Sequence, residues 1–324
     1  MGVQAGFYLH PASALHDTGW GHPEHQGRMR ALASTVGRDM IALHGVVEQR
    51  EGADAAVDDL LRVHTHAHVE RVRAACMQAK ARQTILSLDE DTKVSPATWD
   101  AAVGSAGVAI AAAEAVATGQ LRTAFVAARP PGHHATPDRA MGFCLFNSVA
   151  VVARWLQAHG HAERVLIIDW DVHHGNGTQD IFYEDPSVYF VSLHQWPHWP
   201  GTGAASERGA GRGEGTTLNV PVPAATPRAE YRRMFERAVA DATRDFTPDF
   251  VLVSSGFDAM AGDPLGGLLL EPEDMHAMTR HLIEGVAGSC DGRVVALLEG
   301  GYHPERLGLA TAAVLRALAG LPLA

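Results

Sequence analysis

The chain has 324 residues, 46% of them hydrophobic and 19% charged, which is typical of one large α/β domain. A formal net charge of −11 disfavours binding to nucleic-acid phosphates and fits a neutral or cationic ligand better. The three cysteines, Cys76, Cys144 and Cys290, are far apart and form no CxxC pair, so a disulfide framework is not expected and a reducing cytoplasm is favoured.

Membrane association is not expected. The N-terminal residues lack a basic segment followed by an apolar one, so no signal peptide is predicted. The longest apolar stretch, Val103 to Ala117, is interrupted by Gly104 and Glu114 and is too short to cross a bilayer. We therefore expect a cytoplasmic protein.

Short β-branched runs alternate along the chain with longer runs rich in Ala and Leu. The candidate strands are Phe7–His10, Thr123–Ala127, Val165–Asp169, Val188–Leu193, Phe250–Ser254 and Val294–Leu298. The candidate helices are Asp58–Ala79, Ala97–Thr118, Asn147–His159, Pro227–Asp245, Pro272–Val286 and Pro304–Leu318. This alternation predicts one α/β domain over residues 1–324, with a mostly parallel sheet covered by helices on both faces.

Polar clusters follow four of the predicted strands. In chain order they are Arg129-Pro-Pro-Gly-His-His134, Asp169-Trp-Asp-Val-His-His-Gly-Asn176, Ser255-Gly-Phe-Asp258 and Glu299-Gly-Gly-Tyr302. Ligands of open α/β sheets bind outside the carboxyl ends of the strands. The four clusters therefore predict a functional site at that edge of the sheet.

Two of these clusters contain the residue types of a metal site. Asp171 and His173 are two positions apart at a strand end, so their side chains point to the same side, and Asp258 can reach them from another strand. One histidine and two carboxylates leave an open coordination position, as a catalytic zinc requires. Asp169 lies on the same side and is expected to support the ligands rather than bind the ion. A lone Asp-x-His pair is commonly structural, but four clusters together favour a metal site.

The other histidines are weaker candidates. His64, His66 and His68 alternate without a nearby carboxylate cluster, so we do not expect them to bind a functional metal. His22 and His25 are expected near the surface or in support of a loop.

From His16-Asp-Thr-Gly19 and His22-Pro-Glu-His25 to Glu299-Gly-Gly-Tyr302, the motifs and their order resemble the histone deacetylase superfamily. The likeness is greatest to its class II members and to the bacterial histone deacetylase-like amidohydrolases. The resemblance implies the three-layer arginase–deacetylase fold, an eight-stranded, mostly parallel sheet between helices. It also implies zinc-dependent hydrolysis of an acyl amide, most simply acetyl, on a lysine-like amine.

The same resemblance implies a role for each matching residue. Asp171, His173 and Asp258 match the zinc ligands, and Tyr302 matches the catalytic tyrosine that stabilises the oxyanion. His134 matches the histidine expected to act as general acid and base, and Asn176 beside it is typical of class II. His133 matches its electrostatic partner, oriented by Asp169.

The resemblance also implies a substrate tunnel. Gly142 matches the glycine whose carbonyl accepts the substrate N–H, and Phe143 and Trp199 match the paired tunnel aromatics. The family usually has Phe at the second position, so Trp199 is a departure that affects tunnel width. Leu265 matches a rim position where a polyamine-preferring relative has glutamate, which favours acyl-lysine over acetylpolyamines.

Structural potassium is implied in the same way. The matching residues are Asp169, Asp171, His173, Ser192 and Leu193 for an inner site, and Phe182, Asp185 and Val188 for part of an outer one.

Several alternatives remain open from the sequence. They are an acetylpolyamine amidohydrolase, a non-catalytic acyl-lysine reader and an arginase-type enzyme with two metal ions. Tyr302 disfavours the reader, and the aromatic tunnel and Asn176 disfavour the two-metal enzyme. The expected partners are an acylated peptide, protein or small amine; a homo-oligomer and the choice between zinc and iron are left open.

Overall fold

A computed structural model describes residues 4–323 of the chain. Eight strands form one sheet in the order β2-β1-β5-β10-β9-β6-β7-β8, and every neighbouring pair is parallel. Their bounds are β1 Ala5–Leu9, β2 Val47–Arg50, β5 Thr123–Ala127, β6 Val165–Asp169, β7 Val188–Gln195, β8 Thr217–Val222, β9 Phe250–Ser255 and β10 Val294–Leu298. A small antiparallel pair, β3 (Leu86–Ser87) and β4 (Lys93–Val94), lies apart from the sheet.

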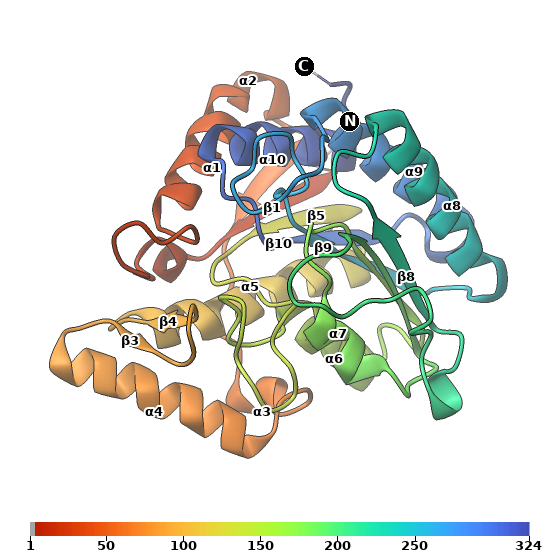
Figure 1. Ribbon diagram of the computed structural model, residues 1–324. Helices are drawn as coiled ribbons and strands as arrows, with labels where there is room; N and C mark the ends of the chain where they lie inside the picture. The colour runs from red at the N-terminus through yellow and green to blue at the C-terminus, as the bar shows by residue number, and fades with distance from the viewer. Residues whose placement is uncertain (1–3, 324) are drawn as a thin grey trace.

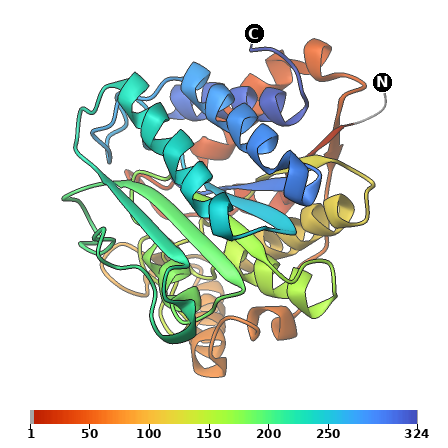
Figure 2. The ribbon, with the colours of Figure 1, turned by 90° about the vertical axis from the view of Figure 1, so that its right-hand side faces the viewer.

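Helices cover both faces of the sheet (Figures 1 and 2). One face carries α1 Gly27–Arg38, α2 Met40–Leu43, α8 Arg228–Asp245, α9 Pro272–Cys290 and α10 Pro304–Leu318. The opposite face carries α5 Thr98–Ala117, α6 Ser148–Ala158 and α7 Asn176–Phe182, with α3 Val57–Leu60 and α4 His66–Arg82 packed outside them. Two short 3-10 turns span Pro11–Ala14 and Gly211–Gly213.

The central strands are apolar because both of their faces are buried. In β6, Leu166 and Ile168 pack under the α8–α10 layer, while Val165 and Ile167 pack under the α5–α6 layer. This is the reason that the strand is a continuous apolar run rather than an alternating one. The predicted arginase–deacetylase architecture, with its parallel eight-stranded sheet between helices, is confirmed.

Most predicted elements agree with the structure to within a few residues, but some do not. The predicted helix over 58–79 is two helices, α3 and α4, because Thr65 caps a new start by accepting the amide of His68. Strands β2 and β8, the two edges of the sheet, were not predicted. The sequence of β2 is mostly polar, and β8 contains Pro221, so neither has the apolar pattern of the inner strands. Helices α1, α2 and α7 were not predicted either.

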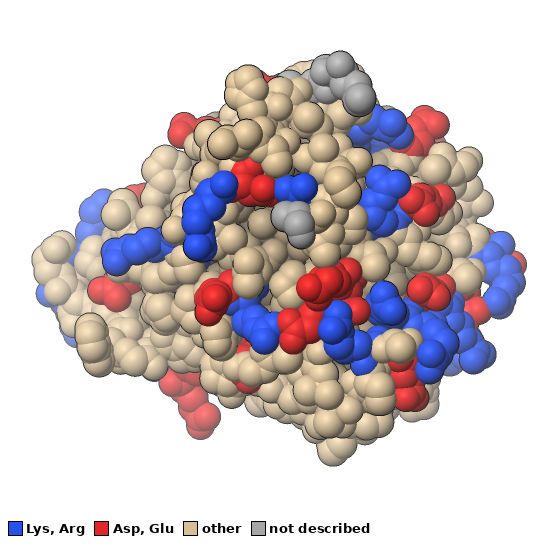
Figure 3. Space-filling model, turned by 90° about the horizontal axis from the view of Figure 1, so that it is seen from above, with Lys and Arg blue, Asp and Glu red and all other residues tan. Residues whose placement is uncertain are grey.

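Helix α5 is longer than the apolar stretch 103–117. By length and composition alone it could cross a membrane, but 72% of its apolar window is buried in the fold, as in a core helix. The face in Figure 3 carries acidic and basic side chains beside each other instead of a single-sign field. Ion pairs such as Arg228–Glu273 and Arg280–Glu284 bring opposite charges together on the protein surface.

Candidate active site

The four polar clusters meet at one edge of the sheet. The strands that precede them, β5, β10, β9 and β6, are consecutive neighbours, so their carboxyl ends lie side by side. This confirms the expected convergence, and it follows from the strand order, which the sequence alone did not provide.

Asp171, His173 and Asp258 form one of the groups that could hold a metal ion. One ligand atom from each lies within 4.8 Å of the others, and all three residues are buried. Backbone amides orient the two carboxylates: His173 N donates to Asp171 Oδ1 at 2.9 Å, and Val172 N donates to Asp258 Oδ1 at 2.8 Å.

The chemistry of this group fits a divalent cation. Among residues 4–323, none donates a hydrogen bond to the buried Asp258 Oδ2, which lies 3.2 Å from His173 Nδ1. Burial, together with the neighbouring Asp171 carboxylate, raises the pKa of Asp258 to about 7. Burial would lower the pKa of His173, but the two carboxylates raise it to about 10. The buried carboxylates of Asp171 and Asp258 lie close together and therefore need a positive charge beside them, which a bound metal ion would supply.

The backbone approaches these carboxylates closely at Gly300. Its N–H donates to Asp171 Oδ2 at 2.8 Å, and a Cβ added there would lie 2.1 Å from Asp258 Oδ2. Any side chain at this position would therefore occupy the space beside the unpartnered oxygen.

The tandem histidines have different partners and opposite protonation preferences. His133 Nδ1 lies 2.9 Å from Asp169 Oδ2, whereas His134 Nδ1 lies 2.8 Å from Asn176 Oδ1. Burial opposes the charged form of His133, but Asp169 and Asp171 outweigh it and raise its pKa well above the usual value. Burial and the adjacent His133 hold the pKa of His134 well below the usual value. One imidazole is therefore suited to be charged and its neighbour to be a neutral base.

Tyr302 lies against this centre from the loop after β10. Its ring is buried, 5.8 Å from the ring of Phe143, and the Arg28 guanidinium lies 5.0 Å from its centroid. Burial and the nearby Asp258 carboxylate raise the pKa of Tyr302 well above its usual value. The phenol therefore stays protonated and can donate a hydrogen bond.

Aromatic side chains surround the approach to the histidines. Gly142 and Phe143 both have positive φ and form a tight turn closed by mutual hydrogen bonds between Met141 and Cys144. A Cβ at Gly142 would lie 2.5 Å from the Trp199 ring, so only glycine fits there. Trp199 packs edge-on against His134, with ring centroids 4.6 Å apart.

His198 connects the loop that carries Trp199 to the loop that carries Leu265. Its Nε2 lies 2.9 Å from the Leu265 carbonyl, and its ring stacks on His173 with centroids 5.1 Å apart. Beside Tyr302 opens a cavity of about 970 Å³ that the exposed Trp20 also lines.

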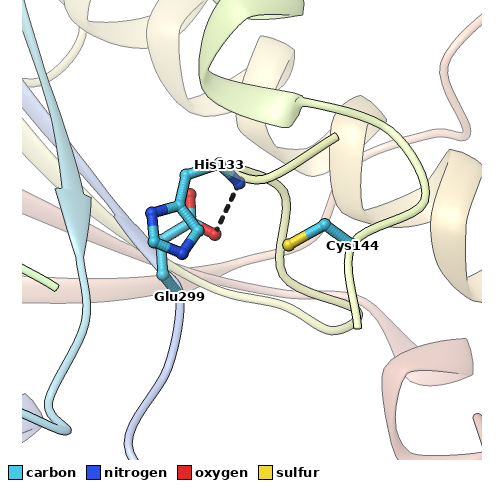
Figure 4. Close-up of side chains that lie close together, drawn as sticks. All are labelled: His133, Cys144 and Glu299. Carbon is cyan, nitrogen blue, oxygen red and sulfur yellow. Dashed lines mark hydrogen bonds between the residues drawn. The ribbon is translucent and has the colours of Figure 1, made fainter. Parts of the chain in front are cut away.

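A second group of potential ligands consists of His133, Cys144 and Glu299 (Figure 4). Its carboxylate is already engaged: Glu299 Oε2 accepts the amides of Gly132 and His133, and Oε1 accepts the Ser254 hydroxyl. Burial raises the pKa of the Cys144 thiol well above its usual value. This arrangement fixes the backbone of the tandem histidines, and a metal there would have to break it.

The residues matched to potassium occupy two regions. In the first, Asp169 and Ser192 are register partners on β6 and β7, and Leu193 follows. In the second, Phe182 and Val188 flank a turn in which Asp185 N donates to the Phe182 carbonyl at 3.0 Å. The Asp185 carboxylate is paired with Arg154 at 2.6 Å, and its carbonyl accepts the Val188 N–H at 3.5 Å.

Sequence reasoning missed several supporting residues. Arg129 and Arg28 are fully buried and both pair with the buried Glu24 carboxylate. Burial would raise the pKa of Glu24, but the two arginines hold it at about 2. The sequence contains one signal for this pair: Arg129 and Glu24 both lie within the motifs shared with the family. An ionisable side chain that is buried with such a motif needs a partner of opposite charge. His22 does more than support a loop, since its ring contacts Phe143 at 4.7 Å.

His64, within the 64–68 segment, has a structural role in the fold. His64 Nδ1 lies 3.0 Å from the Thr136 carbonyl, and its Nε2 accepts the Asn147 amide at 2.9 Å. With both ring nitrogens engaged, His64 has no lone pair left for a metal.

Comparisons with known proteins agree with this geometry. A family model described as "Histone deacetylase domain" matches residues 22–318. A "Probable deacetylase" of Archaeoglobus fulgidus is 38% identical over 98% of this chain and 87% of its own. The "Histone deacetylase-like amidohydrolase" of Pseudomonas aeruginosa is 38% identical over 98% of this chain and 81% of its own.

A solved structure extends the likeness to the fold. The crystal structure of the HDA15 HD domain superposes with a TM-score of 0.91 at 35% identity, covering 99% of this chain and 91% of that one. The motifs, the fold and these relatives lead to one conclusion: the chain belongs to the histone deacetylase family of deacetylases and amidohydrolases.

Proposed function

We propose that this protein is a zinc-dependent deacetylase that hydrolyses the acetyl amide of a lysine-like amine to acetate and the free amine. The observation that carries the proposal is the unpartnered, buried Asp258 Oδ2 in a group with Asp171 and His173. One nitrogen and two oxygen ligands suit a catalytic zinc, which leaves positions for water and substrate.

Zinc held by Asp171, His173 and Asp258 would polarise the amide carbonyl and lower the pKa of a bound water. His134, neutral because of its burial, takes the proton from the attacking water and later delivers it to the leaving amine. His133, held charged by Asp169, stabilises the negative charge that develops. The protonated Tyr302 phenol donates a hydrogen bond to the oxyanion.

The proposed substrate is an acyl-lysine side chain in a peptide or protein. Phe143 and Trp199 would contact its aliphatic stem, and the Gly142 carbonyl would accept its N–H. Leu265 offers no charge for a second ammonium group at the rim, which disfavours polyamines. An acetylpolyamine amidohydrolase is the second candidate, because Asp89, Glu90 and Asp91 lie in a loop that contacts the mouth through the bond from Phe143 N to Thr92 Oγ1.

Further parts of the proposal concern the whole chain. We propose that residues 1–324 are a single catalytic domain that works in the cytoplasm. We also propose that potassium binds chiefly through carbonyl oxygens of Asp169, Asp171, His173, Ser192 and Leu193, and at an outer site of Phe182, Asp185 and Val188. The adjacency of β6 and β7, which brings two carbonyl rows together, supports the inner site.

The test is hydrolysis of an acetyl-lysine peptide by the purified enzyme before and after chelation. Activity should vanish on chelation and return with added Zn²⁺, and the Asp258→Ala variant should not be restored. Comparing Zn²⁺ with Fe²⁺ in the restoration identifies the better metal. Undiminished turnover in a preparation that contains no metal would refute the proposal.

A further inference from the structure

Asp263 occupies an unusual place between β9 and the loop that carries Tyr302. It is only 6% exposed, and both of its carboxylate oxygens are used. Oδ2 accepts the backbone N–H of Tyr302 at 2.6 Å and that of His303 at 3.2 Å. Oδ1 accepts the N–H of Leu265 at 2.9 Å.

The bond to Leu265 alone would make Asp263 an ordinary turn residue, because aspartate commonly caps the amide two positions ahead. The bonds to Tyr302 and His303 are different, since they reach across about 40 positions of sequence to another loop. A single carboxylate therefore joins two loops that enter the site from different strands.

The Tyr302 loop is tightly constrained at its other points as well. Gly301 has φ of +116°, and a Cβ there would lie 2.9 Å from Phe257 Cβ. Its carbonyl accepts Arg28 Nε at 2.7 Å. The residue after this glycine is Tyr302 itself, and its own N–H is bound by Asp263. The carboxylate thus acts at the peptide group from which the phenol extends.

We infer that Asp263 is a positioning residue for Tyr302: it binds the tyrosine's backbone amide and so keeps the phenol where it can donate to the oxyanion. This inference rests on the proposed deacetylase function. Oxyanion stabilisation depends on donors fixed in advance to within a fraction of an ångström, so a loosened Tyr302 loop lowers turnover without removing the hydroxyl.

The same carboxylate links the phenol to the substrate rim. The Leu265 N–H donates to Asp263, and the Leu265 carbonyl accepts a hydrogen bond from His198 Nε2. His198 directly precedes the tunnel aromatic Trp199. The two oxygens thus have separable duties: Oδ2 holds the Tyr302 loop and Oδ1 holds the rim.

The test is a double-mutant cycle of Asp263→Ala and Tyr302→Phe, with kcat and KM measured on an acetyl-lysine peptide. Asp263→Ala should lower kcat at least about tenfold, since a lost oxyanion donor acts on the transition state, whereas loss of the Oδ1 bond to Leu265 at the rim should appear in KM. In the Tyr302→Phe background the same change should cost less than about threefold, because the two act through one group. A trifluoroacetyl-lysine substrate, whose carbonyl is activated, should be less sensitive to Asp263→Ala.

Asp249→Ala is the matched control. Its carboxylate also accepts two backbone amides, those of Glu163 and Arg164 at 2.9 and 2.8 Å, but in the loop that enters β6 at the opposite edge. Its kcat should equal that of the wild type. Asp263→Asn keeps one oxygen for the Tyr302 loop and should lose less kcat than the alanine variant, and it replaces that variant in the cycle if alanine prevents folding.

Two results would overturn the inference: an equal loss from the Asp263 substitution in both Tyr302 backgrounds, or a kcat equal to that of the wild type. A wild-type enzyme with no metal-dependent activity on acetyl-lysine would instead contradict the proposed function. The two failures are therefore distinguishable.

Discussion

The inner centre and the mouth of the site are held in different ways. At the centre, His133, His134, Asp171 and Asp258 are buried, and each has a hydrogen-bond partner in the segment from the end of β6 to the start of α7. At the mouth, Trp199 is 43% exposed and Trp20 is fully exposed, on loops outside any strand or helix.

This difference separates chemistry from selectivity. Four adjacent parallel strands leave the inner residues little freedom, so the groups proposed to react are fixed by the fold itself. Loops can change length and sequence at small cost to the core. We therefore expect substitutions at the centre to abolish turnover and substitutions at the mouth to redirect it.

The largest effect is expected at the tandem histidines. His134→Ala removes the proposed proton carrier and should lower kcat by about 10²–10⁴. His133→Ala removes only a charge held by Asp169 and should cost less. Both are measured as kcat at the pH optimum with an acetyl-lysine peptide, and an equal or reversed order would show that the division of labour is wrong.

Tyr302→Phe tests the point where the centre meets the mouth. The variant keeps the ring contact with Phe143 but loses one oxyanion donor, which typically costs about 10²–10³ in kcat. A trifluoroacetyl substrate should lose less, because its carbonyl is already activated. If both substrates retained full turnover, Tyr302 would belong to the mouth alone.

The buried His64, which contacts the loop after the tandem histidines, should contribute to the loss of stability in acid. Burial lowers the pKa of His64 to about 3, below its ordinary value of 6.5. Between these values the unfolded chain binds a proton that the folded one excludes, so stability falls as the pH drops from 6.5 toward 3, by a few kcal/mol in all. His64→Gln should flatten this part of the pH profile of unfolding free energy.

The control for that measurement is His66→Gln, two residues away on the exposed side of α4. Its slope should match that of the wild type. A wild-type slope in the His64 variant would show that this imidazole is not excluded from protonation in the fold.

The smallest effect is expected at the rim. Leu265→Glu adds a charge that can pair with a distal ammonium, worth about 1 kcal/mol, or roughly fivefold in preference. The ratio of kcat/KM for N8-acetylspermidine over acetyl-lysine peptide should rise by that factor. Leu269→Glu, at another partly exposed leucine of the loop, should leave the ratio unchanged. A wild-type preference for the polyamine would reverse the substrate assignment.

How much the sequence could predict follows the same division. Strands such as Val165–Asp169 were located to the residue, because burial on both faces demands an unbroken apolar run. The edge strands β2 and β8 were missed because they are not buried on both faces, so their sequences are not unbroken apolar runs. Asp171, His173 and Asp258 were recognisable from residue type and spacing, whereas Asp263 was not. Its role depends on two loops that meet only in three dimensions.

The position of β10 has a consequence for how the chain acquires its structure during synthesis. It is the last strand of the described chain, yet it lies in the interior of the sheet between β5 and β9. Until it emerges from the ribosome, the strands β2-β1-β5 and β9-β6-β7-β8 share no hydrogen-bonded neighbour. A nascent chain therefore exposes two unpaired inner edges, which are prone to association with other chains. The strand that closes them also delivers Glu299 and Tyr302, so completion of the sheet and completion of the site coincide.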